Sequence, residues 1–446
     1  MKILVIQVSR SKSILQPQGN GTFMSNDLAA SSMSSSARWR IVMLLVIFAA
    51  FGHFNRVGIS VAGSEVFIAK MGLSETKMGW VYTEFLIAYT LGMLPGGWLI
   101  DRIGSARAMT LYGYSMGIFV ALTGTLGWIT NDVQSLWLGL LVIRSFAGLC
   151  NVPLHPGAAH VISETMPERS RATANGMVTA GAVTGIAFSY PLFGTLIDRL
   201  DWPLAFVVCG MMLMVYGWIW SQMTNPYLAK ERVTSSDASG EHDSRFGLGL
   251  LSQGNLWLLS LSYGAYGYFQ YLFFYWMSYY FESVLHVPVV ESRWTSFWIM
   301  LAQGAGMTVG GLSTDRICQH LGTARGRRVI VMTGMGLGAI FGLLAVNVTE
   351  QINVAACLAV SMAALGMCEG VFWTTATDIG GNSRGLSGAF MNTGGNVGGL
   401  ISPVLTPFMA KQIGWPGSIT VACVVAGLGG AVWFAIKLPE PAKDKS

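Results

Sequence analysis

The octapeptide GWLIDRIG (residues 97–104) returns 214 residues later as GLSTDRIC (311–318), and the two segments share the pattern G-x-x-x-D-R-I. A second pair, RATANGMVTAGAVTGIAFSYP (171–191) and RGLSGAFMNTGGNVGGLISP (384–403), is separated by 213 residues. Two matches at nearly one offset indicate a chain built from two repeated halves, an organisation found in transporters made of parallel repeats. Chance similarity between glycine-rich helices is the alternative interpretation.

The composition indicates a membrane protein. Of the 446 residues, 52% are hydrophobic and 11% are charged, and the mean hydropathy is +0.52. A soluble domain carries roughly 25% charged residues. The net charge of +5 reflects basic loops, so a nucleic-acid partner is not predicted. The six cysteines show no CxxC spacing, so no metal site, disulfide framework or cofactor is predicted.

Apolar runs of about 20 residues, the length that crosses a bilayer, predict an all-α membrane protein with twelve spans in two bundles of six. The spans are expected at about 39–66, 78–100, 107–129, 134–156, 173–197, 203–222, 255–284, 294–317, 328–347, 352–377, 386–410 and 417–437. The corresponding domains are a disordered cytoplasmic tail (1–37), an N-terminal six-helix bundle (38–222), a cytoplasmic central loop (223–252), a C-terminal six-helix bundle (253–438) and a cytoplasmic tail (439–446).

Lysine and arginine in the loops predict the orientation in the membrane. With the N-terminus inside, 20 basic residues fall on the cytoplasmic side, two fall within spans, and five fall outside: Lys70, Lys77, Arg199, Arg293 and Lys411. Basic residues are enriched in cytoplasmic loops, so both termini are expected in the cytoplasm. We expect a monomer in a bacterial inner membrane or a plasma membrane.

Two arginines fall inside apolar spans, Arg56 in FGHFNRVGIS (51–60) and Arg144 in the fourth span. Each lies about ten residues, or about 15 Å, from the outer face, close to the bilayer midplane. Two cations at one depth repel each other unless an anion lies between them, and a guanidinium matches a carboxylate or phosphate. The sequence therefore predicts a central anion site. The alternative is that each arginine pairs with an acid in its own half, for instance Glu84.

Helical spacing adds polar residues to both arginine-bearing faces, because positions three, four and seven apart share one side of a helix. His53 and Ser60 fall on the face of Arg56. The face of Arg144 carries Gly148, Asn151 and His155.

The second half offers further groups that could hydrogen-bond the hydroxyls of a sugar acid or contact an aromatic acid. They are Tyr271, Tyr275, Gln303, Asn392 and Asn396. Tyrosine in membrane helices is also typical of packing and of the lipid–water interface.

The segment GGWLIDRIGSAR (96–107) resembles the signature loop of the major facilitator superfamily. The resemblance implies two rocking six-helix bundles and a cytoplasmic network that breaks and reforms as they move. Ordinary positive-inside anchoring is the alternative for these residues. The network residues implied are Gly97, Asp101, Arg102 and Arg107, with Asp315, Arg316 and Arg327 in the second copy.

Finer features are similar to the anion:cation symporter branch, which includes sugar-acid symporters, sialin and vesicular glutamate transporters. This resemblance implies that Arg56 and Arg144 bind the substrate carboxylate. Tyr89, in the matched stretch of the second span, is a further candidate for substrate binding, as is His53 on the face of Arg56. The features that carry it are the Asn55–Arg56 pair, the R-x-x-x-G-x-x-x-x-P pattern (144–153), the stretch 89–96, YYFES (279–283), FW (372–373) and MNTGGNVGGLISP (391–403).

The chain departs from this branch at two positions. Proton-coupled members carry Asp before the first-helix arginine and Glu seven residues after the fourth-helix arginine, whereas this chain has Asn55 and Asn151. Amides cannot titrate, so the usual proton symport is in doubt. Intramembrane carboxylates are functional candidates and histidine titrates near neutral pH, so Glu84, His53 and Glu369 are the candidates for coupling. Sodium symport, exchange and facilitated diffusion are the alternatives.

These patterns predict a secondary transporter rather than an enzyme. GYSMG (113–117) matches the G-x-S-x-G nucleophile motif, but that motif requires a strand-to-helix turn and here lies within a membrane span. We expect import of a small organic anion, such as a sugar acid or another carboxylate, by alternating access coupled to a proton or sodium ion. Uncoupled facilitation, exchange, or export of a different small molecule are the alternatives.

Overall fold

The computed structural model describes residues 33–130, 132–228, 252–380 and 384–438, and all statements below refer to these ranges. Their regular secondary structure is helical throughout. Most of the predicted N-terminal tail, most of the central loop and the C-terminal tail lie outside the described residues.

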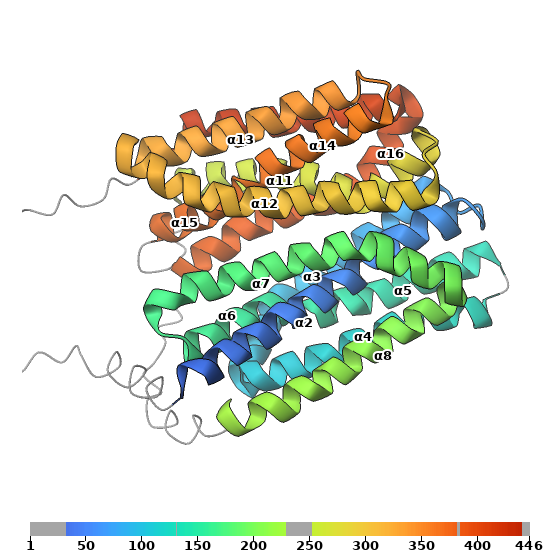
Figure 1. Ribbon diagram of the computed structural model, residues 1–446, viewed down its shortest axis with the longest axis horizontal. Helices are drawn as coiled ribbons and strands as arrows, with labels where there is room; N and C mark the ends of the chain where they lie inside the picture. Colours follow the sequence, from blue (N-terminus) through green and yellow to red (C-terminus); the bar gives the residue numbers. More distant parts are fainter. Residues whose placement is uncertain (1–32, 131, 229–251, 381–383, 439–446) are drawn as a thin grey trace, which may run out of the picture.

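The first half of the chain forms one bundle of helices, coloured blue to green in Figure 1. The helix α8 contains a turn at Asp201, where φ is 61°. The residues of α8 before this turn continue the pass of α7 and η2, and those after it form the next pass. The elements are α2 (Ser35–Ala62), η1 (Gly63–Ile68), α3 (Glu75–Ile103), α4 (Ser105–Ile129), α5 (Val133–Asn151), α6 (Leu154–Thr165), α7 (Glu168–Phe188), η2 (Ser189–Phe193) and α8 (Gly194–Leu228).

The second half forms the other bundle, coloured yellow to red in Figure 1. A turn at Gly414, where φ is 74°, divides α16 in the same way. The short helices α5 and α6 together make one pass, and so do α14 and α15. The described helices therefore make twelve passes in two sets of six, which confirms the predicted fold class. The elements are α11 (Gly254–Tyr279), η3 (Tyr280–Val284), α12 (Val289–Leu321), α13 (Thr323–Ala345), α14 (Gln351–Gly366), α15 (Glu369–Gly380), α16 (Arg384–Ala431) and η5 (Val432–Phe434).

Polar caps fix where several helices begin. The hydroxyl of Ser34 accepts a hydrogen bond from the Ala37 amide, and the carboxylate of Asp132 accepts from the amides of Gln134 and Ser135. Such caps satisfy amides that have no partner inside the helix. With its cap, α2 begins four residues before its apolar run and α5 begins one residue before its own, because their capped first turns are polar.

The helix that carries each copy of the repeated motif ends in a tight turn at glycine. Gly104 separates α3 from α4 with a φ of 85°, and Gly322 separates α12 from α13 with a φ of 80°. Only glycine adopts such angles without strain. We call the face that carries these turns, together with the start of α2 and the end of η5, the termini face, and the other end of the bundles the opposite face.

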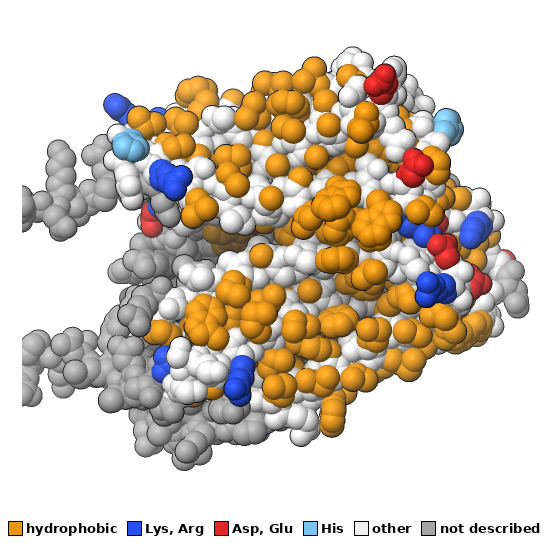
Figure 2. Space-filling model, viewed as in Figure 1, with side chains coloured by type: hydrophobic (Ala, Val, Ile, Leu, Met, Phe, Trp, Pro, Cys, Tyr) orange, Lys and Arg blue, Asp and Glu red, His pale blue; other side chains and the backbone are white. Residues whose placement is uncertain are grey.

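The outer surface of the bundles suits a lipid environment. Figure 2 shows hydrophobic side chains over both bundles, with charged side chains gathered towards the two ends. Seven helices or merged helix segments of the described chain are long and apolar enough to cross a membrane. The long helices α3, α11 and α12 lie outside that set. The chain is an integral multi-pass membrane protein.

The helix pairs that join the halves include α2 with α11, α3 with α16, and α7 with α12. Thr83 on α3 donates a hydrogen bond to the Leu400 carbonyl on α16 at 2.8 Å. Tyr190 of η2 donates to the Phe274 carbonyl on α11 at 3.3 Å. These contacts lie in the parts of the helices that are nearer the opposite face.

Candidate functional site

Arg56 on α2 and Arg144 on α5 meet in the protein interior. Their exposed fractions are 6% and 1%. Both guanidinium carbons lie over the ring of Phe85 from α3, at 5.2 and 4.4 Å from its centroid. Arg144 also donates a hydrogen bond from Nη2 to the backbone carbonyl of Arg56 at 3.3 Å. The structure thus brings together the two arginines that the sequence placed at one depth.

Aromatic residues from both halves surround Arg56. Its Nη2 donates to the hydroxyl of Tyr271 on α11 at 2.9 Å, and its guanidinium carbon lies 5.4 Å from that ring's centroid. The ring of Tyr89, on α3, is 5.7 Å away. Cations over aromatic faces are attracted by the ring quadrupole. Arg56 therefore contacts both bundles. Its partners there are aromatic rings and a hydroxyl group, which carry no negative charge to compensate its own.

Tyr275 completes this aromatic cage one turn after Tyr271. It lies within electrostatic range of both guanidinium groups. Tyr82 stacks against it, with ring centroids 4.6 Å apart. The Tyr275 hydroxyl and the Nε of Arg144 are buried and have no hydrogen-bond partner among the described residues. Buried polar atoms are costly without partners, so both are available to a bound polar ligand.

No acidic side chain of the described chain pairs with either arginine. The described ion pairs are His160–Glu164, Arg293–Glu65, Arg293–Asp198 and Arg327–Asp378. Glu84, the predicted alternative partner, instead accepts a hydrogen bond from Ser145 at 2.9 Å. The site therefore holds two buried cations and no described anion, which is an environment that attracts a negatively charged ligand.

Asn55 and Asn151, the two amides at which the sequence departs from the branch it resembles, lie close to the arginines along the chain. Asn55 donates from Nδ2 to the Phe51 carbonyl at 2.8 Å, while its Oδ1 is buried without a described partner. Both polar side-chain atoms of Asn151 are buried without a partner among the described residues. These amides can accept or donate hydrogen bonds, but they cannot carry a proton through the transport cycle.

His53 on α2 meets His155 on α6. Their Nε2 atoms are 3.4 Å apart and their ring centroids are 5.0 Å apart. From the sequence, His155 was expected only on the face of Arg144. The spacing of residues along the chain gives no signal for this contact, because it depends on how α6 packs against α2.

Of the five candidates from the second half, Tyr271 and Tyr275 are the two that the described contacts connect with the arginines. Gln303 is fully buried, and both polar atoms of its amide lack a described partner. Asn396 is buried and Asn392 is half-buried. Glu369 accepts hydrogen bonds from the Tyr263 hydroxyl at 2.8 Å and from the Trp373 indole at 2.9 Å.

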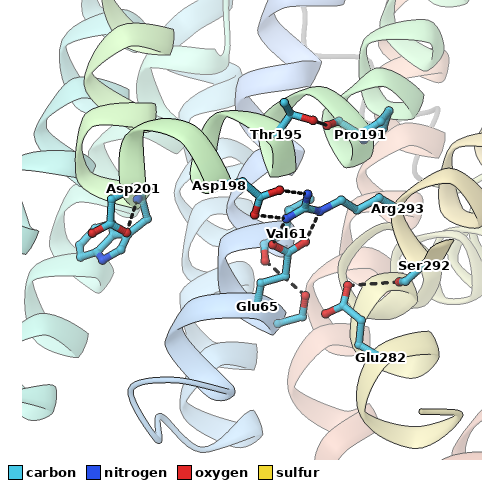
Figure 3. Close-up of polar contacts among 11 residues, drawn as sticks. Val61, Glu65, Pro191, Thr195, Asp198, Asp201, Glu282, Ser292 and Arg293 are labelled. Atoms are coloured by element: carbon cyan, nitrogen blue, oxygen red, sulfur yellow. Dashed lines mark hydrogen bonds and ion pairs between the residues drawn. The ribbon is translucent and has the colours of Figure 1, made fainter. Parts of the chain in front are cut away.

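Arg293 on α12 forms an ion cluster between the halves, near the opposite face (Figure 3). It donates to Glu65 of η1 at 2.8 and 2.6 Å, and to Asp198 of α8 at 2.5 and 3.0 Å. Glu282 of η3 lies beside the cluster and accepts a hydrogen bond from Ser292 at 3.1 Å. Arg293 was expected among the basic residues outside the membrane spans, but it is buried. Glu65, an acid inside an apolar stretch, was the signal that could have identified its partner.

The repeated motif lies at the termini face. Arg102 is exposed and its guanidinium carbon lies 5.1 Å from the ring centroid of Trp98. Arg327 in the second copy pairs with Asp378 at 2.6 Å. Gly97, Arg107 and Arg316 belong to the same surface, whereas the side chains of Asp101 and Asp315 lie outside the described residues. The described residues contain no group of three or more potential metal ligands.

Two packed six-helix bundles with a buried polar site at their boundary are the architecture of a membrane transporter. The chain belongs to the Major Facilitator Superfamily, whose family model matches residues 42–379 and 294–446. It is accordingly a transporter and not an enzyme, as the sequence predicted.

Solved structures agree with this fold. A bacterial homolog of the human lysosomal transporter Spinster, in an inward-facing and unoccupied conformation, superimposes with a TM-score of 0.72. The alignment covers 91% of this chain and 98% of that chain at 15% sequence identity.

Several curated proteins are similar over most of their length. The "Probable galactarate/D-glucarate transporter GudP" of Bacillus subtilis is 25% identical over 405 residues, which are 85% of this chain and 87% of that protein. The "Probable sulfoacetate transporter SauU" of Cupriavidus necator is 25% identical over 387 residues, 84% of this chain and 87% of that protein. The "D-galactonate transporter" of Escherichia coli is 24% identical over 429 residues, 90% of this chain and 95% of that protein.

Proposed function

We propose that this protein is a secondary transporter that imports a small organic anion, such as a sugar acid, by cation-coupled alternating access. The observation that carries the proposal is the Arg56–Arg144 pair, which shares the Phe85 ring and has no described carboxylate partner. The names of the similar proteins, which refer to sugar acids and sulfoacetate, support the same ligand class.

A carboxylate fits this site for electrostatic and geometric reasons. It would offset the repulsion between two buried guanidinium groups, and its two oxygens match the planar donor fork of an arginine. The hydroxyl groups of a sugar acid would find partners in the Tyr275 hydroxyl and the amide of Asn151, which are buried without described partners. Buried groups left unpaired favour a ligand that hydrogen-bonds them.

The position of the site suits alternating access. Arg56 belongs to one bundle and Tyr271 to the other, and a hydrogen bond joins them. An anion held there contacts both bundles and can therefore stabilise one relative arrangement more than another. We place the termini face in the cytoplasm and the Arg293 cluster at the external side, in accordance with the distribution of basic residues. We expect the transporter to act as a monomer.

Transport by purified, reconstituted protein tests the proposal. Vesicles loaded with D-glucarate, D-galactonate or sulfoacetate should take up the same radiolabelled anion by counterflow. Arg56→Ala and Arg144→Ala should each lower this uptake by about 100-fold, because removing one side of a buried charged contact costs roughly 2–5 kcal/mol. Arg40→Ala is the matched control, since Arg40 is an exposed arginine on the same helix as Arg56. Unchanged counterflow in both site variants would refute the anion clamp.

Anion exchange is the second candidate function. Asn55 and Asn151 cannot titrate, which favours a transporter that returns to its starting state with a second anion bound. Such an exchanger would show counterflow but would not accumulate the anion in response to a pH or sodium gradient. A comparison of counterflow with gradient-driven uptake in one vesicle preparation separates the two candidates.

A further inference from the structure

The His53–His155 pair lies next to the arginine site and has a defined hydrogen-bond geometry. His53 is buried, whereas His155 is half-buried and is therefore the more accessible ring. The Nδ1 of His53 lies 3.1 Å from the backbone carbonyl of Ala49. A carbonyl oxygen only accepts hydrogen bonds, so it holds a hydrogen on Nδ1 of His53.

This tautomer leaves the Nε2 of neutral His53 as an acceptor that faces the Nε2 of His155 at 3.4 Å. The neutral pair then contains one hydrogen between the two Nε2 atoms, donated by His155. One further proton converts one of the two rings to imidazolium. A second proton would place two cations side by side, so the pair binds one proton at a time.

Arg56 is the charged group that faces this pair most directly. It follows His53 by three residues on α2, which places both side chains on one face of the helix, and its charge acts on both rings. From α4, Tyr112 presents a buried hydroxyl close to Gly52, and from α3 Tyr89 contacts the Arg56 guanidinium. No described carboxylate forms an ion pair with either ring. The positive charge of Arg56 therefore opposes the addition of a proton.

We propose that the His53–His155 pair binds the coupling proton of anion transport, and that Arg56 links proton binding to anion binding. This inference rests on the proposed function. A carboxylate bound to Arg56 offsets the charge that repels the proton, so anion and proton each strengthen the binding of the other. Linkage requires this coupling to be reciprocal. The histidine pair thereby supplies a titratable group where Asn55 and Asn151 have none.

The two candidate carboxylates have a weaker structural relation to the anion site. Glu84 is hydrogen-bonded to Ser145 and has no described contact with either arginine. Glu369 lies in the other bundle and is held by Tyr263 and Trp373. Neither shares a helix face with Arg56 as His53 does.

Equilibrium binding to the purified full-length chain gives the first test, with D-glucarate, D-galactonate and sulfoacetate as probes. Between pH 6 and pH 8 the Kd of the wild type should rise by up to about tenfold per pH unit, because one proton is bound together with the anion. Titrations in buffers of different ionisation enthalpy should show uptake of about one proton per anion bound. His155→Gln and His53→Gln should flatten this pH dependence, whereas His160→Gln, which changes a partly exposed histidine on α6, should keep it.

Several results would overturn the proposal. If anion binding to the wild type takes up no proton, the proposed proton site is refuted, and no variant is needed for this conclusion. An unchanged pH slope in both His53→Gln and His155→Gln assigns the proton to other groups. A wild type that shows counterflow but no accumulation under a pH gradient refutes the proton site and leaves the proposed anion transport standing. Absence of counterflow with all three probes refutes the proposed function, and the proton site with it.

Discussion

Arg293 of α12 and Glu65 of η1 form a two-point ion pair across the boundary between the bundles, with Nε–Oε1 and Nη2–Oε2 distances of 2.8 and 2.6 Å. Asp198 of α8 binds the same guanidinium from a third element, so one arginine fastens the second half to the first at two places. Any motion that separates the bundles at the opposite face must break this cluster. We propose that this cluster is the gate of the transport cycle at the opposite face.

The first prediction is that Arg293→Ala opens this gate. Removal of the arginine leaves Glu65 buried without a cation, and breaking a buried pair in this way costs about 3–5 kcal/mol. Because of this cost, the variant should favour a conformation that is open at the opposite face, where water reaches the Glu65 carboxylate. A cysteine placed at Ser296, a fully buried residue one turn along α12, should react several-fold faster with a maleimide added to the opposite face.

Arg199→Ala is the control for this measurement, because Arg199 is an exposed arginine close in sequence to Asp198. Equal labelling of the Ser296 cysteine in wild type, Arg199→Ala and Arg293→Ala would show that the cluster does not hold the gate closed.

The second prediction ranks the two acids of the cluster. The side chain of Glu65 is 5% exposed and that of Asp198 is 56% exposed. Solvent weakens an exposed ion pair to about 0–1 kcal/mol, whereas a buried pair that loses one partner costs several kcal/mol. Glu65→Gln should therefore lower the thermal unfolding temperature clearly more than Asp198→Asn does. The reverse order would contradict the burial argument.

The third prediction tests whether the site requires a guanidinium group at position 56 or only a positive charge. Lysine keeps the positive charge, but its compact ammonium lacks the planar fork and the flat face that lies over Phe85, Tyr89 and Tyr271. Arg56→Lys should raise the Kd for a carboxylate probe by about tenfold, equivalent to about 1.4 kcal/mol. Isothermal titration of the purified variant measures this change, and wild-type affinity would show that charge alone suffices.

The sequence predicted the fold well because the features that determine it are local. Span length and the repeated D-R-I motif depend on residues close together in the chain, and the structure contains the expected twelve passes. The main differences are at helix ends. For example, the first helix begins at Ser35 rather than near residue 39, since the Ser34 cap extends it through polar residues.

The candidate site could be predicted only in part. Counting residues from the span ends placed Arg56 and Arg144 at one depth, and the structure brings them to one Phe85 ring. Contacts such as His53 with His155 and Glu65 with Arg293 join residues 102 and 228 positions apart. Such pairings follow from helix packing, which residue spacing in one sequence does not encode.

The fourth prediction separates the hydroxyl of Tyr271 from its ring. Tyr271→Phe removes the 2.9 Å hydrogen bond to Arg56 but keeps the aromatic face over the guanidinium. The loss should be about 0.5–1.5 kcal/mol in anion binding, the net value of one hydrogen bond. Tyr271→Leu removes both contacts and should weaken binding further. Equal affinities in the two variants would show that the ring contributes nothing.

The fifth prediction connects helix packing with the site. Gly398 on α16 packs directly against the backbone of Gly264 on α11, and a Cβ at Gly398 would lie 2.9 Å from the Tyr268 amide nitrogen. Gly398→Ala must therefore push the two helices apart, and such overpacking costs about 1–3 kcal/mol. Because α11 also carries Tyr271, the displacement should weaken anion binding as well as lower the unfolding temperature.

Gly336→Ala is the matched control, because Gly336 lies inside helix α13 and a Cβ there meets no atom within 4 Å. Alanine at such a position reduces the conformational freedom of the unfolded chain and stabilises a helix by about 0.4–1 kcal/mol. The two glycine variants should thus shift the unfolding temperature in opposite directions, and only Gly398→Ala should change the Kd of the anion. If Gly398→Ala lowers stability and leaves anion affinity unchanged, the position of α11 is not what sets the Arg56–Tyr271 contact.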